Sequence, residues 1–142
     1  TDIISGFCTE TEEDHHATLS LMNEVVFDFA YMFSYSERPK TLAERKYKDD
    51  VPEEVKTRRL REIMDLQQKN SAVRTKVGLG KVHRVLVERI SKKNSEELAG
   101  RNSQNGVVVF PKGDFKKGDY VDVLAESCTI ATLIGSVVRA KS

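Results

Sequence analysis

The stretch FDFAYMFSY, residues 27–35, decides how the first half of this 142-residue chain is built. Aromatic residues occupy every second position, with Ala30 and Met32 between them, which predicts a strand that is covered on both faces. Upstream, DIISGF at residues 2–7 has the length and composition of a second short strand. Residues 11–25 are predicted to form a helix between the two strands, because apolar residues recur there at helical spacing: Ala17, Leu21, Met22 and Val25.

A strand, a helix and a strand in this order predict a βαβ unit with parallel strands. Thr9 and Glu12 have the spacing of a capping box, and the acids that follow Thr9 compensate the helix dipole. Two parallel strands cannot cover both faces of their own sheet. Further strands must therefore come from the rest of a longer protein, or from a second copy in a strand-exchanged homodimer. The chain also opens inside a strand, with neither an initiator Met nor a signal peptide, so we expect a piece of a longer protein.

A second helix is predicted to begin at DDVPEE, residues 49–54, and to run to about residue 74. Its buried positions are expected to be Leu60, Ile63, Leu66 and Val73. Its first arginines are expected to lie in solvent: Arg58, Arg59 and Arg61. Gly78 and Gly80 follow the helix and are predicted to join two domains, residues 1–75 and residues 76–142.

From Lys81 onward the pattern changes to short apolar segments separated by Gly, Asn and Lys. We predict five strands, at residues 81–90, 97–103, 106–110, 119–127 and 129–138. Five short strands in so small a domain predict a closed barrel of the OB type. The predicted fold class is therefore α+β: a partial βαβ unit and a linking helix, followed by a small five-stranded barrel.

The net charge of +1 conceals a division between the two halves. Residues 1–70 hold 10 Lys and Arg against 15 Asp and Glu, whereas residues 71–142 hold 13 against 7. Because OB-type barrels bind nucleic acid through cations on strands and loops, the basic half is predicted to bind RNA. Phe110 and Phe115 either stack on bases or belong to the core. The candidate RNA-binding residues are Lys81, Arg84, Lys92, Lys93, Arg101, Lys112, Lys116 and Lys117.

The sequence contains no Walker loop, no HExxH motif and no Ser/His/Asp arrangement. Its two cysteines, Cys8 and Cys128, are too few for a self-contained iron–sulfur site and fit a reducing, cytoplasmic compartment. No run approaches the roughly 20 apolar residues of a membrane helix. His15 and His16 are expected to be exposed and structural. We therefore predict no catalytic and no metal-binding residue in this chain.

Polar residues follow both predicted strands of the first half. In α/β barrels the reacting groups lie at the carboxyl ends of the strands, so these residues are candidates for a cofactor or substrate cavity. Gly6 would let the backbone approach a ligand closely. The alternative is that Glu10 only helps to cap the helix and that Arg38 only pairs with Glu37. The candidate cavity residues are Gly6, Phe7, Glu10, Ser34, Tyr35 and Arg38.

Four segments, in the same order, resemble the radical-SAM methylthiotransferases. TDIISGFCTETEEDHHATLSLM is similar to their TDIIVGFPGETEEDFxxTL segment, and FDFAYMFSYSERPKTLAER is similar to FxYSxRPGTxA. VPEEVKTRRLREIMDLQQ resembles the linking helix that follows. The remainder, with GRNSQNGVVVF and KGDFKKGDYVDV, resembles the TRAM domain, an RNA-binding barrel. The Ser-Glu-Arg-Pro sequence at residues 36–39 resembles the tRNA-modifying, MiaB-like branch more than the branch that modifies a ribosomal protein.

The resemblance implies that the first half is the end of a (βα)6 radical-SAM barrel and that the second half is a TRAM domain. It implies an enzyme that adds a 2-methylthio group to isopentenyl-adenosine beside the tRNA anticodon, using S-adenosylmethionine and two 4Fe-4S clusters. The cluster-binding CxxxCxxC motif is absent here, so this piece alone is expected to bind tRNA weakly, hold no cofactor and catalyse nothing. The alternatives are a stand-alone OB-type RNA-binding protein and the ribosomal-protein-modifying branch.

Two departures from the family pattern lie beside the candidate cavity. Cys8-Thr9 stands where the family has Pro-Gly, and Lys40 stands where the family has the Gly of RPGT. Since Gly adopts backbone conformations that other residues disfavour, these replacements put the local backbone geometry in question.

Overall fold

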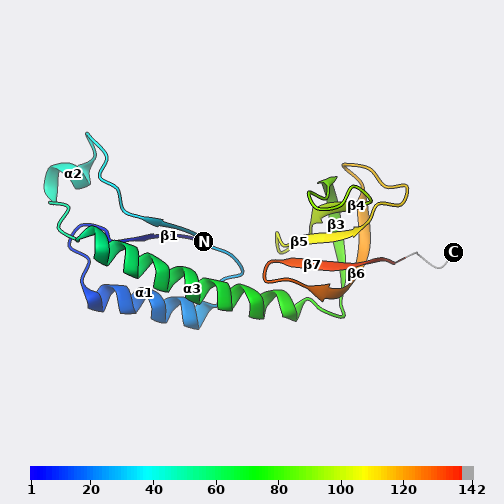
Figure 1. The fold of residues 1–142 in the computed structure, drawn as a ribbon, viewed down its shortest axis with the longest axis horizontal. Coiled ribbons are helices and arrows are strands. Elements are labelled where there is room, and N and C mark those ends of the chain that lie inside the picture. The colour runs from blue at the N-terminus through cyan, green and yellow to red at the C-terminus, as the bar shows by residue number, and fades with distance from the viewer. Residues whose placement is uncertain (139–142) are drawn as a thin grey trace. The chain divides into compact units, whose positions relative to one another are not determined.

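The computed structural model describes residues 1–138, and its contacts divide the chain between Ser71 and Ala72 into two compact units. The first unit mixes helices with a small sheet, and the second contains the end of the last helix followed by strands (Figure 1). The predicted α+β class is confirmed. Of the helices in this described part of the chain, none combines the length and the apolar composition that a membrane crossing requires.

Two short parallel strands form the sheet of the first unit. β1 (Asp2–Ser5) and β2 (Tyr31–Ser34) pair in a register that places Asp2 beside Tyr31 and Ser5 beside Ser34. The predicted strand–helix–strand order with parallel strands is thereby confirmed. β2 is shorter than the strand predicted over residues 27–35. The carbonyls of Phe27 and Asp28 accept from the α3 side chains of Gln67 and Ser71, each at 2.9 Å, and these two residues lie outside the β1–β2 register.

The helix between the strands, α1 (Glu12–Val25), begins at a different cap from the one predicted. Thr11 is the N-cap: its hydroxyl accepts from the backbone N–H of Asp14 at 3.1 Å, and its own N–H donates to the Asp14 carboxylate at 2.9 Å. The capping box predicted for Thr9 and Glu12 is wrong. Thr9 has φ +69°, whereas an N-cap residue needs an extended backbone.

A short helix, α2 (Leu42–Lys46), precedes α3 (Glu53–Val77), which lies alongside α1 in Figure 1. The buried face of α3 is largely polar, and among the four positions predicted to be buried only Ile63 is fully so; Val73 is exposed. The amides of Gln67 and Asn70 donate to the carbonyls of Phe27 (2.9 Å) and Met22 (3.1 Å). The Met22 carbonyl also accepts from the Val26 N–H at 2.9 Å, so Asn70 adds a second hydrogen bond at the end of α1. Hydrogen bonds from polar side chains therefore join α3 to the end of α1.

Large apolar side chains of the first unit remain exposed, which agrees with the expectation that two parallel strands cannot cover both faces of their own sheet. Phe33, for example, is 55% exposed. Exposed apolar side chains gathered on neighbouring elements are typical of a surface that packs against further protein. The residues concerned on the sheet, on α1 and between them are Ile4, Leu21, Val25, Phe29, Tyr31 and Phe33.

The second unit is a closed barrel with strand order β3-β4-β5-β7-β6. Its strands are β3 (Val82–Ile90), β4 (Glu97–Arg101), β5 (Val107–Pro111), β6 (Tyr120–Cys128) and β7 (Thr132–Val137). β5 and β7 pair in parallel, and the other neighbouring pairs are antiparallel. The prediction of a five-stranded closed barrel is confirmed.

Alternating residues of these strands fill the barrel. Its core consists of Val85, Val87, Leu98, Val108, Phe110, Val121, Val123, Ala125 and Leu133. Two glycines let strands approach where the barrel is tight: a Cβ at Gly135 would lie 1.9 Å from the Leu124 carbonyl oxygen, and one at Gly100 would lie 2.2 Å from that of Leu86. Register shifts in β3 and β6 add the bends that closure requires.

Candidate functional site

The loop that follows β1 is tied to α3 by one carboxylate. Glu10 accepts a hydrogen bond from the backbone N–H of Gly6 at 3.0 Å, which closes the loop on itself. Its other oxygen accepts from the guanidinium of Arg59 at 2.8 Å, and Arg59 also donates to the Glu10 carbonyl at 3.0 Å. Glu10 therefore fixes the strand-end loop from the helix that lies beside it.

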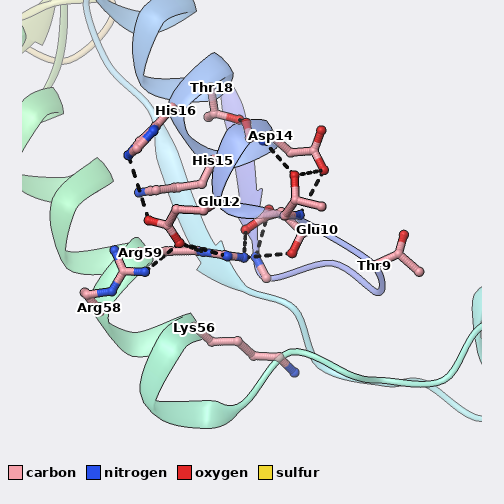
Figure 2. A network of polar contacts seen from close by, with 12 residues as sticks. Thr9, Glu10, Glu12, Asp14, His15, His16, Thr18, Lys56, Arg58 and Arg59 are labelled. Carbon is pink, nitrogen blue, oxygen red and sulfur yellow. Dashed lines mark hydrogen bonds and ion pairs between the residues drawn. The ribbon is translucent and has the colours of Figure 1, made fainter.

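Around this link, charged side chains of α1 and α3 form the ion-pair network shown in Figure 2. Both Arg58 and Arg59 pair with Glu12, at 2.7 Å and 3.0 Å, and these contacts lower the pKa of Glu12 to about 2. Arg58 also pairs with Glu62 at 2.8 Å. Arg59 is only 5% exposed, so the prediction that the arginines of α3 lie in solvent is wrong for this residue.

His15 belongs to the same network. Its Nε2 lies 2.6 Å from the Glu62 carboxylate, and its side chain is buried, so the expectation of an exposed His15 is wrong. His16, the next residue, is exposed as predicted. Contact with His15, followed by contact with Arg58, lowers the pKa of Glu62. Glu62 therefore lies between His15 of α1 and Arg58 of its own helix, and both contacts favour its ionised form.

A buried lysine occupies the space beside Gly6. A Cβ at Gly6 would lie 2.4 Å from Cγ of Lys56, which is 1% exposed. The Nζ of Lys56 donates to the Asp49 carboxylate at 2.8 Å and to the Tyr35 carbonyl at 3.4 Å. Burial acts to lower the pKa of Lys56, but its pairing with Asp49 and Glu53 outweighs burial and raises it. In this structure the missing side chain at Gly6 makes room for Lys56; the role of Gly6 toward a ligand stays a prediction.

The other strand-end residues gather around an aromatic pair. The rings of Phe7 and Tyr35 meet edge to face with centroids 5.0 Å apart, so the ends of β1 and β2 are in contact. The Cys8 side chain, together with desolvation, raises the pKa of Tyr35 to about 12, so its phenol is protonated at neutral pH. Ser34 is half-buried beside Ser5, and Arg38 is exposed. The structure thus brings Phe7, Glu10 and Tyr35 close to α3, and their part in binding a ligand stays a prediction.

Both departures from the family pattern fall on left-handed backbone. Thr9 has φ +69° and Lys40 has φ +68°, at the two positions where the resembling segments carry Gly. The side chains have therefore changed while the backbone keeps a conformation that suits Gly. Thr9 is the more strained of the two, because a β-branched side chain disfavours this region more strongly.

Replacing Thr9 with Gly is expected to raise the free energy of unfolding of the first unit by about 1 kcal/mol, because the left-handed strain is relieved. Thr18→Gly, the same chemical change inside α1, is expected to lower it by about 0.4 kcal/mol, because Gly is a poorer helix former than Thr. Urea unfolding followed by the helical circular dichroism signal measures both. A Thr9→Gly variant that is less stable than the parent would show that contacts of the Thr9 side chain outweigh the strain.

In the barrel, five of the predicted RNA-binding lysines lie on two loops. Lys92 and Lys93 are in the loop between β3 and β4, whereas Lys112, Lys116 and Lys117 are in the loop between β5 and β6. The two loops adjoin, because the backbone N–H of Lys112 donates to the Glu96 carbonyl at 2.9 Å. All five lysines are exposed. We call the two loops that carry them, residues 91–96 and 112–119, the lysine loops.

The predicted arginines lie on the outer face of the strands. Arg101 of β4 lies opposite Leu86 of β3 in the strand register. Leu86 and Arg84 are two residues apart on β3, so Arg84 and Arg101 point to the same side of the sheet. Leu86 also pairs with Tyr120 of β6, and the guanidinium of Arg84 lies over the Tyr120 ring at 5.2 Å. Lys81 is exposed just before β3. The barrel therefore presents cations both on its loops and on the face made by β3, β4 and β6.

Residues 76–138 match the family model of the TRAM domain. The barrel is a TRAM domain. The match agrees with the closed five-stranded barrel and with the resemblance predicted from this part of the sequence.

The whole chain is similar to proteins named tRNA-2-methylthio-N(6)-dimethylallyladenosine synthase. It is 60% identical over 136 residues to the one from Amoebophilus asiaticus and 57% identical over 141 residues to the one from Flavobacterium johnsoniae. These alignments cover 96% and 99% of this chain but only 28% and 29% of the relatives. The relative from Bacteroides thetaiotaomicron is 51% identical over 138 residues, with 30% of its length covered. The resemblance to methylthiotransferases is confirmed, and the chain spans less than a third of the relatives' length.

Within the TRAM domain, the two phenylalanines considered for stacking belong to the interior. Phe110 is 0% exposed at the centre of the core, and Phe115 packs against that core from the loop. The exposed aromatic residue is Tyr120, which the sequence analysis missed. A signal for it was present: Val121, Val123 and Ala125 alternate inward along β6, which places Tyr120 on the outer face.

The residues of this chain do not fit an iron–sulfur cluster. Such clusters are held by cysteine thiolates, usually four, and this chain has two cysteines that lie in different units. In the described residues no three His, Cys, Asp or Glu side chains gather in an arrangement suited to a metal ion. Cluster ligands would therefore have to come from elsewhere in a longer protein.

Proposed function

We propose that this chain is the C-terminal part of a tRNA methylthiotransferase that adds a 2-methylthio group to isopentenyl-adenosine beside the anticodon. The observation that carries the proposal is the similarity, over nearly the whole chain, to relatives named for that modification. The first unit would complete the catalytic domain, and the TRAM domain would hold the tRNA. S-adenosylmethionine and two 4Fe-4S clusters, bound by the rest of the enzyme, would supply the radical chemistry and the sulfur.

The exposed apolar side chains of the first unit support this proposal over a stand-alone RNA-binding protein. Ile4, Tyr31 and Phe33 lie on a two-stranded sheet that does not cover its own faces. In the longer enzyme, neighbouring strands and helices would cover them. A strand-exchanged homodimer would cover them differently and stays a prediction.

The lysine loops support the RNA-binding role of the TRAM domain. Five exposed cations on two adjoining loops concentrate positive charge in one part of the domain, which favours contact with a phosphate backbone. Binding that depends on phosphate contacts releases counterions, so its affinity falls with salt.

We expect the affinity of this chain for tRNA to fall steeply as salt rises, and the Lys116→Ala/Lys117→Ala variant to flatten that dependence by a slope of about 1.5. Filter binding at several salt concentrations measures the slope. Lys46→Ala/Lys69→Ala, a matched pair of exposed lysines in the first unit, should leave it unchanged. Absent or salt-independent binding would count against the RNA-binding role.

The modification itself needs a separate test. Mass spectrometry of tRNA from a strain lacking the gene for the whole protein should show isopentenyl-adenosine without its methylthio group. If the tRNA is fully modified and a ribosomal protein has instead lost a methylthio group, the chain belongs to the ribosomal-protein-modifying branch.

A further inference from the structure

The outer face of β3 and β6 carries one exposed aromatic ring with an arginine over it. Tyr120 is 62% exposed and lies beside Leu86 of β3, which is half-buried. Arg84 covers part of the ring at 5.2 Å from its centroid. Because most of the side chain stays exposed with Arg84 in place, the rest of the ring is open to a flat ligand.

The turn that precedes Tyr120 is held rigidly against β3. The N–H of Gly118 donates to the Val87 carbonyl at 2.9 Å, and the N–H of Val87 donates to the Asp119 carbonyl at 2.9 Å. The Asp119 carboxylate accepts from the N–H of Lys116 at 2.9 Å, which closes the turn. The backbone of Lys116 and Lys117 is therefore held four and three residues before the ring.

We infer that Tyr120 stacks on an unpaired nucleobase of a bound RNA, with Arg84 against the ring and with Lys116 and Lys117 on the adjacent phosphates. This inference rests on the proposed RNA-binding function and adds the site and the kind of RNA segment it takes. An aromatic ring beside anchored cations is the arrangement that single-stranded nucleic acid needs, because each base has a flat face and each phosphate a negative charge.

The charges on the same face limit where the phosphates lie. Asp122 of β6 lies opposite Arg84 of β3 in the strand register. Glu88 lies 3.5 Å from the guanidinium of Arg101. Arg101 also donates to the Asn105 carbonyl at 2.9 Å, so its charge is already engaged. Phosphates are therefore expected on the side of the lysine loops, and the base is expected over Tyr120.

A stacked base contacts the face of the Tyr120 ring and does not need its hydroxyl. Two variants of Tyr120 therefore remove the ring and the hydroxyl separately. Tyr120→Leu keeps an apolar, strand-compatible side chain without the ring, and Tyr120→Phe keeps the ring without the hydroxyl. Fluorescence anisotropy with the whole chain and a labelled short single-stranded RNA should show about tenfold weaker binding for the Leu variant. The Phe variant should stay within about twofold of the parent.

Three comparisons make the test decisive. An RNA of the same length with abasic riboses should bind the parent chain as weakly as intact RNA binds the Leu variant, and should not distinguish the two proteins. A fully paired duplex should bind both equally. The salt slope should be unchanged in the Leu variant, because no phosphate contact is lost.

The inference is overturned if the Leu variant binds single-stranded RNA normally, if the Phe variant is as weak as the Leu variant, or if the loss also appears on abasic or duplex RNA. Parent binding to abasic RNA as tight as to intact RNA overturns it without any variant, even if the Leu substitution disturbs folding. Failure of the parent chain to bind any RNA is a different result, and it overturns the proposed RNA-binding function itself.

Discussion

Replacing Arg59 with Met is expected to lower the free energy of unfolding of the first unit by about 3 kcal/mol, because it removes one partner of a buried charge pair. The Arg59 side chain is 6% exposed and that of its partner Glu10 is 13% exposed. Without it, Glu10 keeps only the Gly6 N–H as a partner within the hydrogen bonds described above. Urea unfolding followed by the helical circular dichroism signal measures the loss, since all three described helices begin in the first unit.

The neighbouring arginine provides a matched control. Arg58 also pairs with two carboxylates, but it is 46% exposed and its partners are 39% and 45% exposed. Such pairs contribute about 1 kcal/mol or less, so Arg58→Met is expected to cost little. A double-mutant cycle with Glu10→Gln isolates the coupling between Arg59 and Glu10. Equal losses at the two arginines would show that burial of Arg59 adds nothing to its pairing.

Replacing Phe110 with Ala is expected to destabilise the TRAM domain by about 3–5 kcal/mol, because it leaves a cavity in a closed barrel. Its ring is fully buried among core residues from several strands, including Val85, Val108 and Leu133. Hydrogen exchange with mass spectrometry measures this loss as faster exchange of barrel amides, independently of the first unit.

Two further variants separate packing from RNA contact at the phenylalanines. Phe115→Ala removes a ring that is only partly buried, so a smaller loss of barrel protection is expected than for Phe110→Ala. Phe110→Leu largely preserves the core volume and should leave RNA affinity unchanged, because a side chain with no exposed surface cannot stack on a base. Loss of RNA binding in a Phe110→Leu variant whose barrel stays protected would contradict this assignment.

The sequence by itself determined the kind of fold and the order of its elements, apart from the short helix α2, which the sequence analysis did not predict. Side chains on a strand such as β6 return to the same face every two residues, and those on a helix such as α1 every three to four residues. The spacing of apolar residues along the chain therefore predicts both kinds of element. The five barrel strands and the parallel β1–β2 pair followed from such patterns. The family resemblance also followed, because four ordered segments carry it without reference to contacts.

Only the tertiary structure decided which polar residues are buried. Arg59, Gln67 and Asn70 have no apolar signature, and their burial depends on carboxylates and carbonyls supplied by α1 and its flanking loops. The same holds for the N-cap of α1. Thr9 and Thr11 each have an acidic residue three positions later, and only the left-handed backbone of Thr9 (φ +69°) excludes Thr9 as the cap. Periodicity records apolar side chains along one segment, whereas burial of a charge depends on partners far away in the chain.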